Sequence, residues 1–228
     1  MQTDPAVPTS EAGEQVRVWD APTRLFHWSI VALVFVSWLS ADQGYMTVHL
    51  WSGLSLLALL LFRLGWGLMG STTARFGDFL HPPHKVFAYL KTQARGASPL
   101  HAGHNPAGGL MVMALLAVLL AQVMTGLFAN DGLKFGGPLA LFVSDDASDQ
   151  LTRIHGIIFN IILALIWLHV VAVGFYHFVK GDNLVGPMVS GKKHRSRVPE
   201  GANIIFAHPV LALGLLLASA AVAAWILF

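Results

Sequence analysis

Long apolar runs alternate with short polar stretches along this chain. Five apolar segments stand out, at residues 25–41, 48–69, 107–129, 151–179 and 203–228. A helix needs about 17 to 25 mostly apolar residues to cross the hydrocarbon core of a membrane. Each segment is near or above that length, so the pattern predicts an all-α membrane protein with five spanning helices.

Composition supports the membrane class and narrows the chemistry. Hydrophobic residues make up 55% of the 228 positions and charged residues only 11%, which is too apolar for a water-soluble surface. A net charge of +2 provides no basic field that would attract nucleic acid. The chain has no cysteine, which excludes a thiolate iron-sulfur cluster, a covalent c-type haem and a disulfide, whereas 11 histidines are available as ligands.

The loops carry charge of opposite sign at the two ends of the predicted helices. Basic residues follow spans two and four, and cytoplasmic loops are enriched in such residues, so these loops and the N-terminus are predicted to be cytoplasmic. The opposite loops carry mainly aspartate and are predicted to lie outside. The basic set is Arg75, Lys85, Lys91, Arg95, Lys180, Lys192, Lys193, Arg195 and Arg197, and the acidic set is Asp42, Asp131, Asp145, Asp146 and Asp149.

Three regions are expected along the chain. Residues 1–15 are polar and lack the basic start and apolar core of a signal peptide, so they predict a disordered cytoplasmic tail. Residues 16–193 contain the first four spans and are expected to form one bundle. Residues 194–228 are expected to form a basic linker and a fifth transmembrane helix.

Four histidines lie within or at the ends of the predicted spans. His155 and His169 in span four are 14 residues apart, so they project from one face of a helix at depths that differ by about 21 Å. The direction of each span puts His49 at the depth of His155 and His27 at the depth of His169. Any one of them could be a ring hydrogen-bonded to a neighbouring helix. Two depth-matched pairs instead favour axial ligands of two haem groups.

Arg63 follows His49 by 14 residues in span two and therefore lies at the depth of the inner histidine pair. A buried guanidinium needs an anion, and no Asp or Glu lies in the five segments. A haem propionate would meet this need, although a residue near a helix end could also snorkel to the interface. The lack of carboxylates argues against a proton pump or a metal-ion transporter.

These residues fall in motifs that closely resemble the prokaryotic cytochrome b561 superfamily, and most of all the b-type cytochrome subunits of membrane-bound nickel-iron hydrogenases. The resemblance runs from about residue 16 to 193 and implies a four-helix bundle with two haems b, in which His27 pairs with His169 and His49 with His155. The fifth span is not part of that pattern. The motifs are APTRLFHW at 21–28, HLWSG at 49–53, Arg63 with GWG at 65–67 and Gly70, GHNP at 103–106, RIHG at 153–156 and His169-Val170.

The resemblance also implies a function and a location. In this superfamily electrons pass between a partner on the outer side of the bacterial inner membrane and quinone in the lipid. The expected partner is an exterior redox protein, either a hydrogenase-like complex or a c-type cytochrome. Two alternatives remain open from the residues alone: a stand-alone oxidoreductase that acts on a small molecule such as superoxide with quinone as co-substrate, and a haem-free membrane anchor.

Quinone is expected to bind beside the inner haem, near the cytoplasmic ends of spans one and four. The nearest polar side chains there are Arg24, His104, Tyr176 and His177. Each also has a structural interpretation. The sequence Asn105-Pro106 is typical of a helix start, which would account for the segment that holds His104. Tyr176 and His177 would suit the membrane interface.

Overall fold

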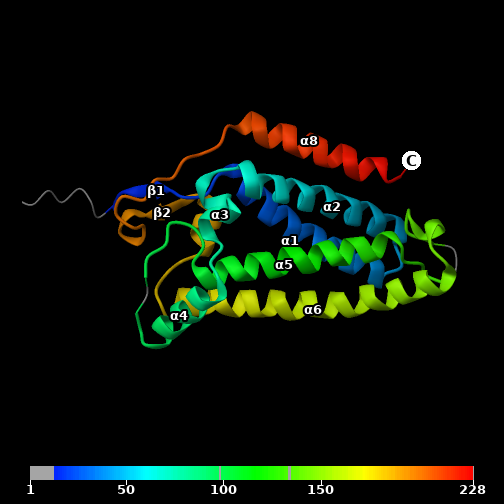
Figure 1. Ribbon diagram of the computed structural model, residues 1–228, viewed down its shortest axis with the longest axis horizontal. Helices are drawn as coiled ribbons and strands as arrows, with labels where there is room; N and C mark the ends of the chain where they lie inside the picture. Colours follow the sequence, from blue (N-terminus) through cyan, green and yellow to red (C-terminus); the bar gives the residue numbers. More distant parts are fainter. Residues whose placement is uncertain (1–12, 98, 133–134, 228) are drawn as a thin grey trace, which may run out of the picture.

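A computed structural model describes residues 13–97, 99–132 and 135–227 (Figure 1). Most of the predicted tail, residues 1–12, lies outside the described residues. In chain order the elements are β1 (Gln15–Arg17), α1 (Ala21–Asp42), α2 (Met46–Met69), η2 (Thr72–Ala74), α3 (Phe76–Phe79), α4 (Pro83–Ala94), α5 (Pro106–Leu127), η3 (Ala140–Phe142), α6 (Asp145–Phe178), α7 (Val185–Ser190), β2 (Lys192–His194), η4 (Arg195–Arg197) and α8 (Pro209–Trp225).

Within the described part of the chain, four helices are long and apolar enough to cross a membrane. These are α1, α2, α5 and α6, which confirms the first four predicted spans. The helix in the fifth predicted span, α8, has 17 residues and is shorter than these four. At 1.5 Å per residue it is about 26 Å long, slightly less than the hydrocarbon core of a typical bilayer.

Capping residues set where the helices begin, and they extend two spans beyond the apolar segments. The Asp20 carboxylate accepts from the backbone N–H of Thr23, so α1 begins four residues before the predicted segment. The Ser144 hydroxyl caps α6 in the same way, and the acidic first turn favours the helix dipole. Asn105 caps α5 with Pro106 in its first turn, which confirms the predicted helix start.

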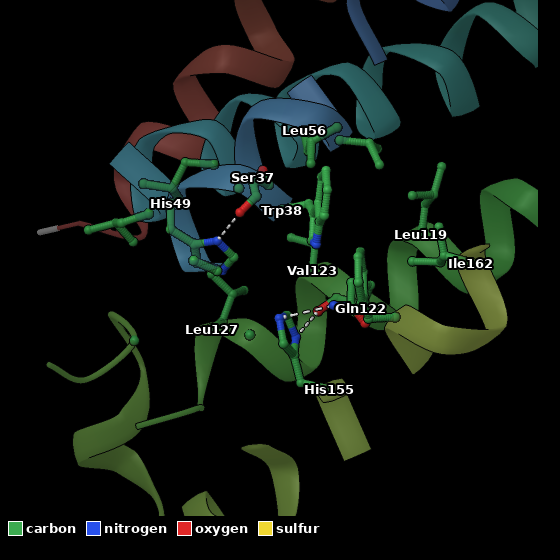
Figure 2. Close-up of a pocket in the computed structure, with 18 of the residues that line it drawn as sticks. Ser37, Trp38, His49, Leu56, Leu119, Gln122, Val123, Leu127, His155 and Ile162 are labelled. Carbon is green, nitrogen blue, oxygen red and sulfur yellow. Dashed lines mark hydrogen bonds between the residues drawn. The ribbon is translucent and has the colours of Figure 1, made fainter. Parts of the chain in front are cut away.

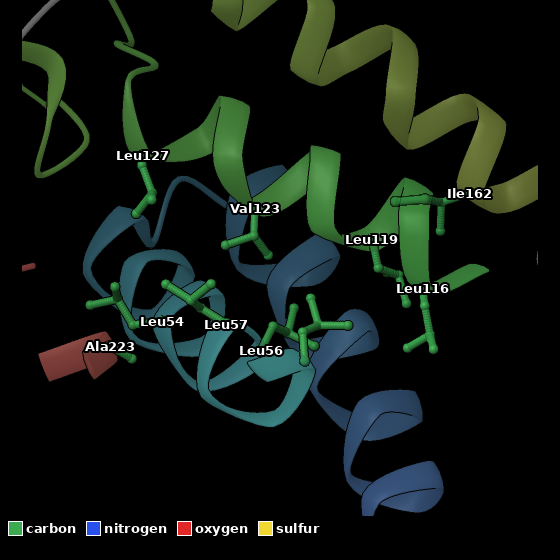
Figure 3. Close-up of a cluster of buried hydrophobic side chains, with 10 residues drawn as sticks. Leu54, Leu56, Leu57, Leu116, Leu119, Val123, Leu127, Ile162 and Ala223 are labelled. Carbon is green, nitrogen blue, oxygen red and sulfur yellow. The ribbon is translucent and has the colours of Figure 1, made fainter. Parts of the chain in front are cut away.

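The helices pack as a bundle around α2 and α5. Contacts are most extensive between α1 and α2, between α5 and α6, and between α2 and α8. A layer of buried leucines and a valine joins α2 to α5, and Ile162 of α6 and Ala223 of α8 extend it (Figure 3). The buried members on α2 and α5 are Leu54, Leu56, Leu57, Leu60, Leu116, Leu119, Val123 and Leu127.

The two ends of the bundle differ in charge and in structure. We call the end where α1 and α5 begin the basic end, and the opposite end, where α2 and α6 begin, the acidic end. At the basic end β1 pairs antiparallel with β2, with Val16 opposite Lys193. The predicted boundaries at residues 16 and 194 both fall inside this strand pair. It ties the start of the chain to the segment that follows α6 (Figure 1).

Candidate functional site

At the acidic end, His49 of α2 and His155 of α6 face each other. Their ring centres are 6.1 Å apart and the ring planes are nearly perpendicular, at 80°. Both rings line a cavity of about 230 Å³ between the helices, with an otherwise mostly apolar wall (Figure 2). Gly53 and Gly156 also line this cavity, and a Cβ atom at either position would have no atom within 4 Å. The glycines therefore leave room for a flat ring beside both histidines.

At the basic end, His27 of α1 and His169 of α6 form the second pair. Their ring centres are 6.5 Å apart, with an angle of 52° between the ring planes. The Nδ1 atom of His27 is buried and has no hydrogen-bond partner among the described residues. The structure thus confirms that His27 faces His169 and His49 faces His155, as the depth of each residue along its helix predicted.

The spacing within each pair suits one iron ion between two imidazoles. A first-row metal ion takes an imidazole nitrogen at about 2 Å, and the ring centre lies about 1 Å further on, so the centres of two opposite rings should be roughly 6 Å apart. Both pairs have this spacing. Within the described ranges no group of three or more His, Cys, Asp or Glu could hold a metal ion. Two imidazoles at this spacing fit a haem iron, whose porphyrin would supply the other ligands.

Backbone carbonyls orient the acidic-end rings. His49 Nδ1 donates to the carbonyl oxygen of Ser37 at 2.8 Å, and His155 Nδ1 donates to that of Gln122 at 2.9 Å (Figure 2). Since Nδ1 carries the proton, Nε2 is left with the lone pair that iron needs. The Gln122 amide nitrogen lies 3.0 Å from His155 Nε2 and donates to it, so this amide would have to move aside for an iron ligand at Nε2. Neither Ser37 nor Gln122 was predicted from the sequence.

A glycine lets α5 approach the ring of His155 closely. A Cβ atom at Gly126 would lie 2.9 Å from Cε1 of His155, closer than two such atoms can approach. We therefore expect Gly126→Ala to displace the His155 ring, so that a haem held between His49 and His155 would be largely lost while one held between His27 and His169 would be kept. Pyridine haemochrome analysis of the purified protein measures this. The control is Gly174→Ala in α6, where a Cβ would have no atom within 4 Å. Equal haem in both variants would contradict the expectation.

Arg63 is buried, with a relative exposure of 3%, and His104 interacts electrostatically with both Arg63 and the basic-end pair. Its guanidinium lies 5.0 Å from the centre of the Phe76 ring, and its Nη1 is buried with no hydrogen-bond partner among the described residues. A buried carboxylate also acts on it, because Asp20 at the start of α1 interacts with Arg63 electrostatically. Asp20 was not predicted at this site, since the apolar segment begins at residue 25. Its carboxylate accepts from the backbone N–H of Thr23 and the indole N–H of Trp66.

The four residues predicted at a quinone site separate into two groups. His104 is buried between Trp19 and Phe79, with ring centres 4.8 Å away in both cases. Burial, reinforced by the charge of Arg63, lowers the pKa of His104 to about 3, so the ring is neutral. The residue that follows His104, Asn105, has a side-chain hydrogen bond with Tyr176. The structure therefore places His104 and Tyr176 in neighbouring positions.

The other two residues have different surroundings. The guanidinium of Arg24 donates to the backbone carbonyl of Val189 in α7. His177 is exposed and packs edge-to-face against its neighbour Phe178. The described contacts of Arg24 and His177 therefore do not join them to Tyr176.

Two side chains from α4 complete the surroundings of Tyr176. Its hydroxyl is 2.7 Å from that of Tyr89, and the amide of Gln93 donates to the Tyr89 hydroxyl at 2.6 Å. These residues and Asn105 line a small polar cavity of about 40 Å³. Helix α4 was not predicted from the sequence, although Val86, Tyr89 and Gln93 follow the three- and four-residue spacing of a helix face.

A family model described as prokaryotic cytochrome b561 matches residues 18–191, which is more than half of the chain. The chain belongs to the prokaryotic cytochrome b561 family. No curated protein matches it. Membership makes this chain a multi-pass bacterial membrane cytochrome of the b type that transfers electrons. The matched region ends just before β2, so the fifth apolar segment lies outside it.

Proposed function

We propose that this cytochrome b561 binds two haems b and carries electrons across the bacterial inner membrane, from an exterior redox protein to quinone. The proposal rests on two histidine pairs at two depths along α6, each with the ring spacing that one iron would require. Haem b, when bound, supplies an iron that accepts and releases one electron at a time. A depth difference of about 21 Å between the pairs is unnecessary unless charge crosses the membrane.

The orientation in the proposal follows the charge of the two ends. The basic end is cytoplasmic and the acidic end is exterior, with the N-terminus in the cytoplasm. His49 and His155 then hold the outer haem, and His27 and His169 the inner one. Helix α8 is a fifth span whose small buried residues Ala212, Ser219 and Ala223 pack on α2, with the adjoining residues completing the length needed to cross the bilayer.

Arg63 is proposed to neutralise a propionate of the inner haem. Its unpartnered Nη1 supports this, because a buried donor without an acceptor is costly. We expect Arg63→Leu to lower the midpoint potential of the inner haem by on the order of 50 mV, because removing a positive charge disfavours the reduced and more negative state. A spectroscopic redox titration measures this. Arg63→Lys should retain most of the potential, and the exposed Arg75→Leu should leave it unchanged. Unaltered potentials in Arg63→Leu would make Arg63 purely structural.

Quinone is proposed to bind near the inner haem, at the basic end. Reduction of one quinone to quinol takes up two electrons and two protons, so the site needs hydrogen-bond donors and a connection to water. The Tyr89, Tyr176 and Gln93 cluster supplies donors next to Asn105 and His104. The nearby Lys180 ammonium donates to the backbone of Gln93 and extends the polar cluster toward the surface.

The exterior partner is proposed to be a hydrogenase-like complex or a c-type cytochrome. The acidic end carries aspartates and an exposed apolar turn between α5 and α6, in which Leu141 is 95% and Phe142 79% exposed. An acidic and partly apolar rim would suit a partner with a basic face around its redox centre. We also propose that, within its family, this chain is most similar to the cytochrome subunits of nickel-iron hydrogenases.

The proposal is tested by a quinone-site inhibitor added to the purified protein. The inhibitor should shift the absorption spectrum or the midpoint potential of the haem that depends on His27 and His169. A shift confined to the other haem, and retained in His169→Ala, would place the quinone site at the acidic end instead. Rapid turnover of superoxide with quinone and no partner protein would support the stand-alone oxidoreductase.

A further inference from the structure

Helix α4 has two apolar faces, and the bundle covers only one of them. Val86 and Tyr89 are buried against the bundle, with relative exposures of 5% and 7%. Phe87 is 72% exposed and Leu90 is 47% exposed. These two residues are three apart and therefore share one side of the helix, which is different from the side that holds Tyr89. A large exposed phenylalanine next to a leucine is an unpartnered apolar surface.

The charge that α4 and its flanking residues carry is entirely positive. Lys85 and Lys91 lie within α4 and Arg95 follows it directly, whereas residues 79–130 contain no Asp or Glu. All three side chains are exposed, and the charge pattern of this helix therefore complements an anionic surface. An exposed apolar stripe flanked by lysine is the pattern of a helix that lies flat in the interface of a membrane.

The position of α4 in the fold brings this surface to the depth of a membrane interface. The Tyr89 hydroxyl is hydrogen-bonded to that of Tyr176, two residues before α6 ends, and α4 also packs on the beginning of α5. Helix α4 thus lies beside the basic end of two spanning helices (Figure 1). This is the depth at which spanning helices leave the hydrocarbon core and meet lipid headgroups.

We propose that α4 is an interfacial helix that binds anionic phospholipid at the basic end of the bundle. Phe87 and Leu90 insert among the upper parts of the acyl chains, and Lys91 and Arg95 contact the phosphates of the headgroups. The lipid is favoured over a protein partner because the bilayer already surrounds α5 and α6 at this point. The proposal does not depend on quinone binding or on the direction of electron flow.

The absence of cysteine from the chain allows a direct test. The variants Phe87→Cys and Leu90→Cys place one thiol on the exposed apolar face. The variant Lys85→Cys is the matched control, because it lies two residues from Phe87 and so on the opposite side of the same helix. Each purified holoprotein is placed in lipid nanodiscs, where both faces of the bilayer meet water, and reacted with a water-soluble maleimide. One set of nanodiscs contains phosphatidylcholine only, and the other also contains phosphatidylglycerol.

We expect the thiols at positions 87 and 90 to react at least about tenfold more slowly than the thiol at position 85. Their protection should be greater in the bilayers that contain phosphatidylglycerol, and high salt should remove that difference. In denaturing detergent all three thiols should react at equal rates. Equal reactivity of positions 87 and 85 in nanodiscs would overturn the proposal and leave this face for a protein partner. Equal protection with and without phosphatidylglycerol would overturn the proposed preference of α4 for anionic phospholipid.

Discussion

Replacing His49 or His155 with alanine is expected to halve the haem content of the purified protein, from two haems b per chain to one. Each residue holds one side of the same iron in the proposed arrangement, and the structure places the two rings 6.1 Å apart. His27→Ala and His169→Ala should also leave one haem, but the other one. Pyridine haemochrome analysis gives the number of haems, and a redox titration shows which potential has been lost.

The pairing is tested by comparing the four variants with one another. His49→Ala and His155→Ala should retain the same single potential, and His27→Ala and His169→Ala should retain the other. His177→Ala is the control, because it is exposed on α6 and should keep both haems. A wild-type content of one haem or none would contradict the arrangement. Loss of the same haem in His49→Ala and His169→Ala would show that the pairs are wrongly assigned.

The second large effect is expected on electron transfer through the membrane. In vesicles that contain quinone, a membrane-impermeant reductant on the acidic side should drive quinol formation with the native protein. In His27→Ala the rate should fall to that of vesicles without protein, because about 21 Å of depth would then separate the acidic-end site from the quinone site. Quinol is measured by its ultraviolet absorbance after extraction.

Two measurements make this result specific. The haem that remains in His27→Ala should still be reduced from the acidic side, which shows that electrons enter as before. Tyr45→Phe changes an exposed residue at the acidic end and should have the native rate. If His27→Ala formed quinol at the native rate, quinone would have to react at the acidic end, and the proposed direction of transfer would be wrong.

The membrane helices and the histidine pairs could be predicted from the sequence. In lipid, a long apolar segment can hydrogen-bond all of its own backbone groups only as a helix. Four spans therefore follow from composition and length. Each histidine then has a fixed depth along its span. Depth alone therefore matched His27 with His169 and His49 with His155, and the ring positions in the fold agree with that pairing.

Other features depended on contacts between residues far apart in the chain. Gln122 meets His155 only because α5 packs on α6, and Asp20 acts on Arg63 only because α1 begins beside the end of α2. The separation of His104 and Tyr176 from Arg24 and His177 has the same origin, since it depends on which way each side chain points at a helix end.

Helix α4 and the β1–β2 pair emerged only from the packing of the whole chain. The strands are three residues each and more than 170 residues apart, so neither has a local pattern strong enough to predict it. Helix α4 is too short and too polar to stand out by hydropathy, and although Val86, Tyr89 and Gln93 have helical spacing, only the contact with Tyr176 shows what this face packs against. Depth in the membrane can be read from the sequence, because helix rise is regular. Packing alone determines which side chains meet at that depth, because rotation and tilt of a helix depend on its neighbours.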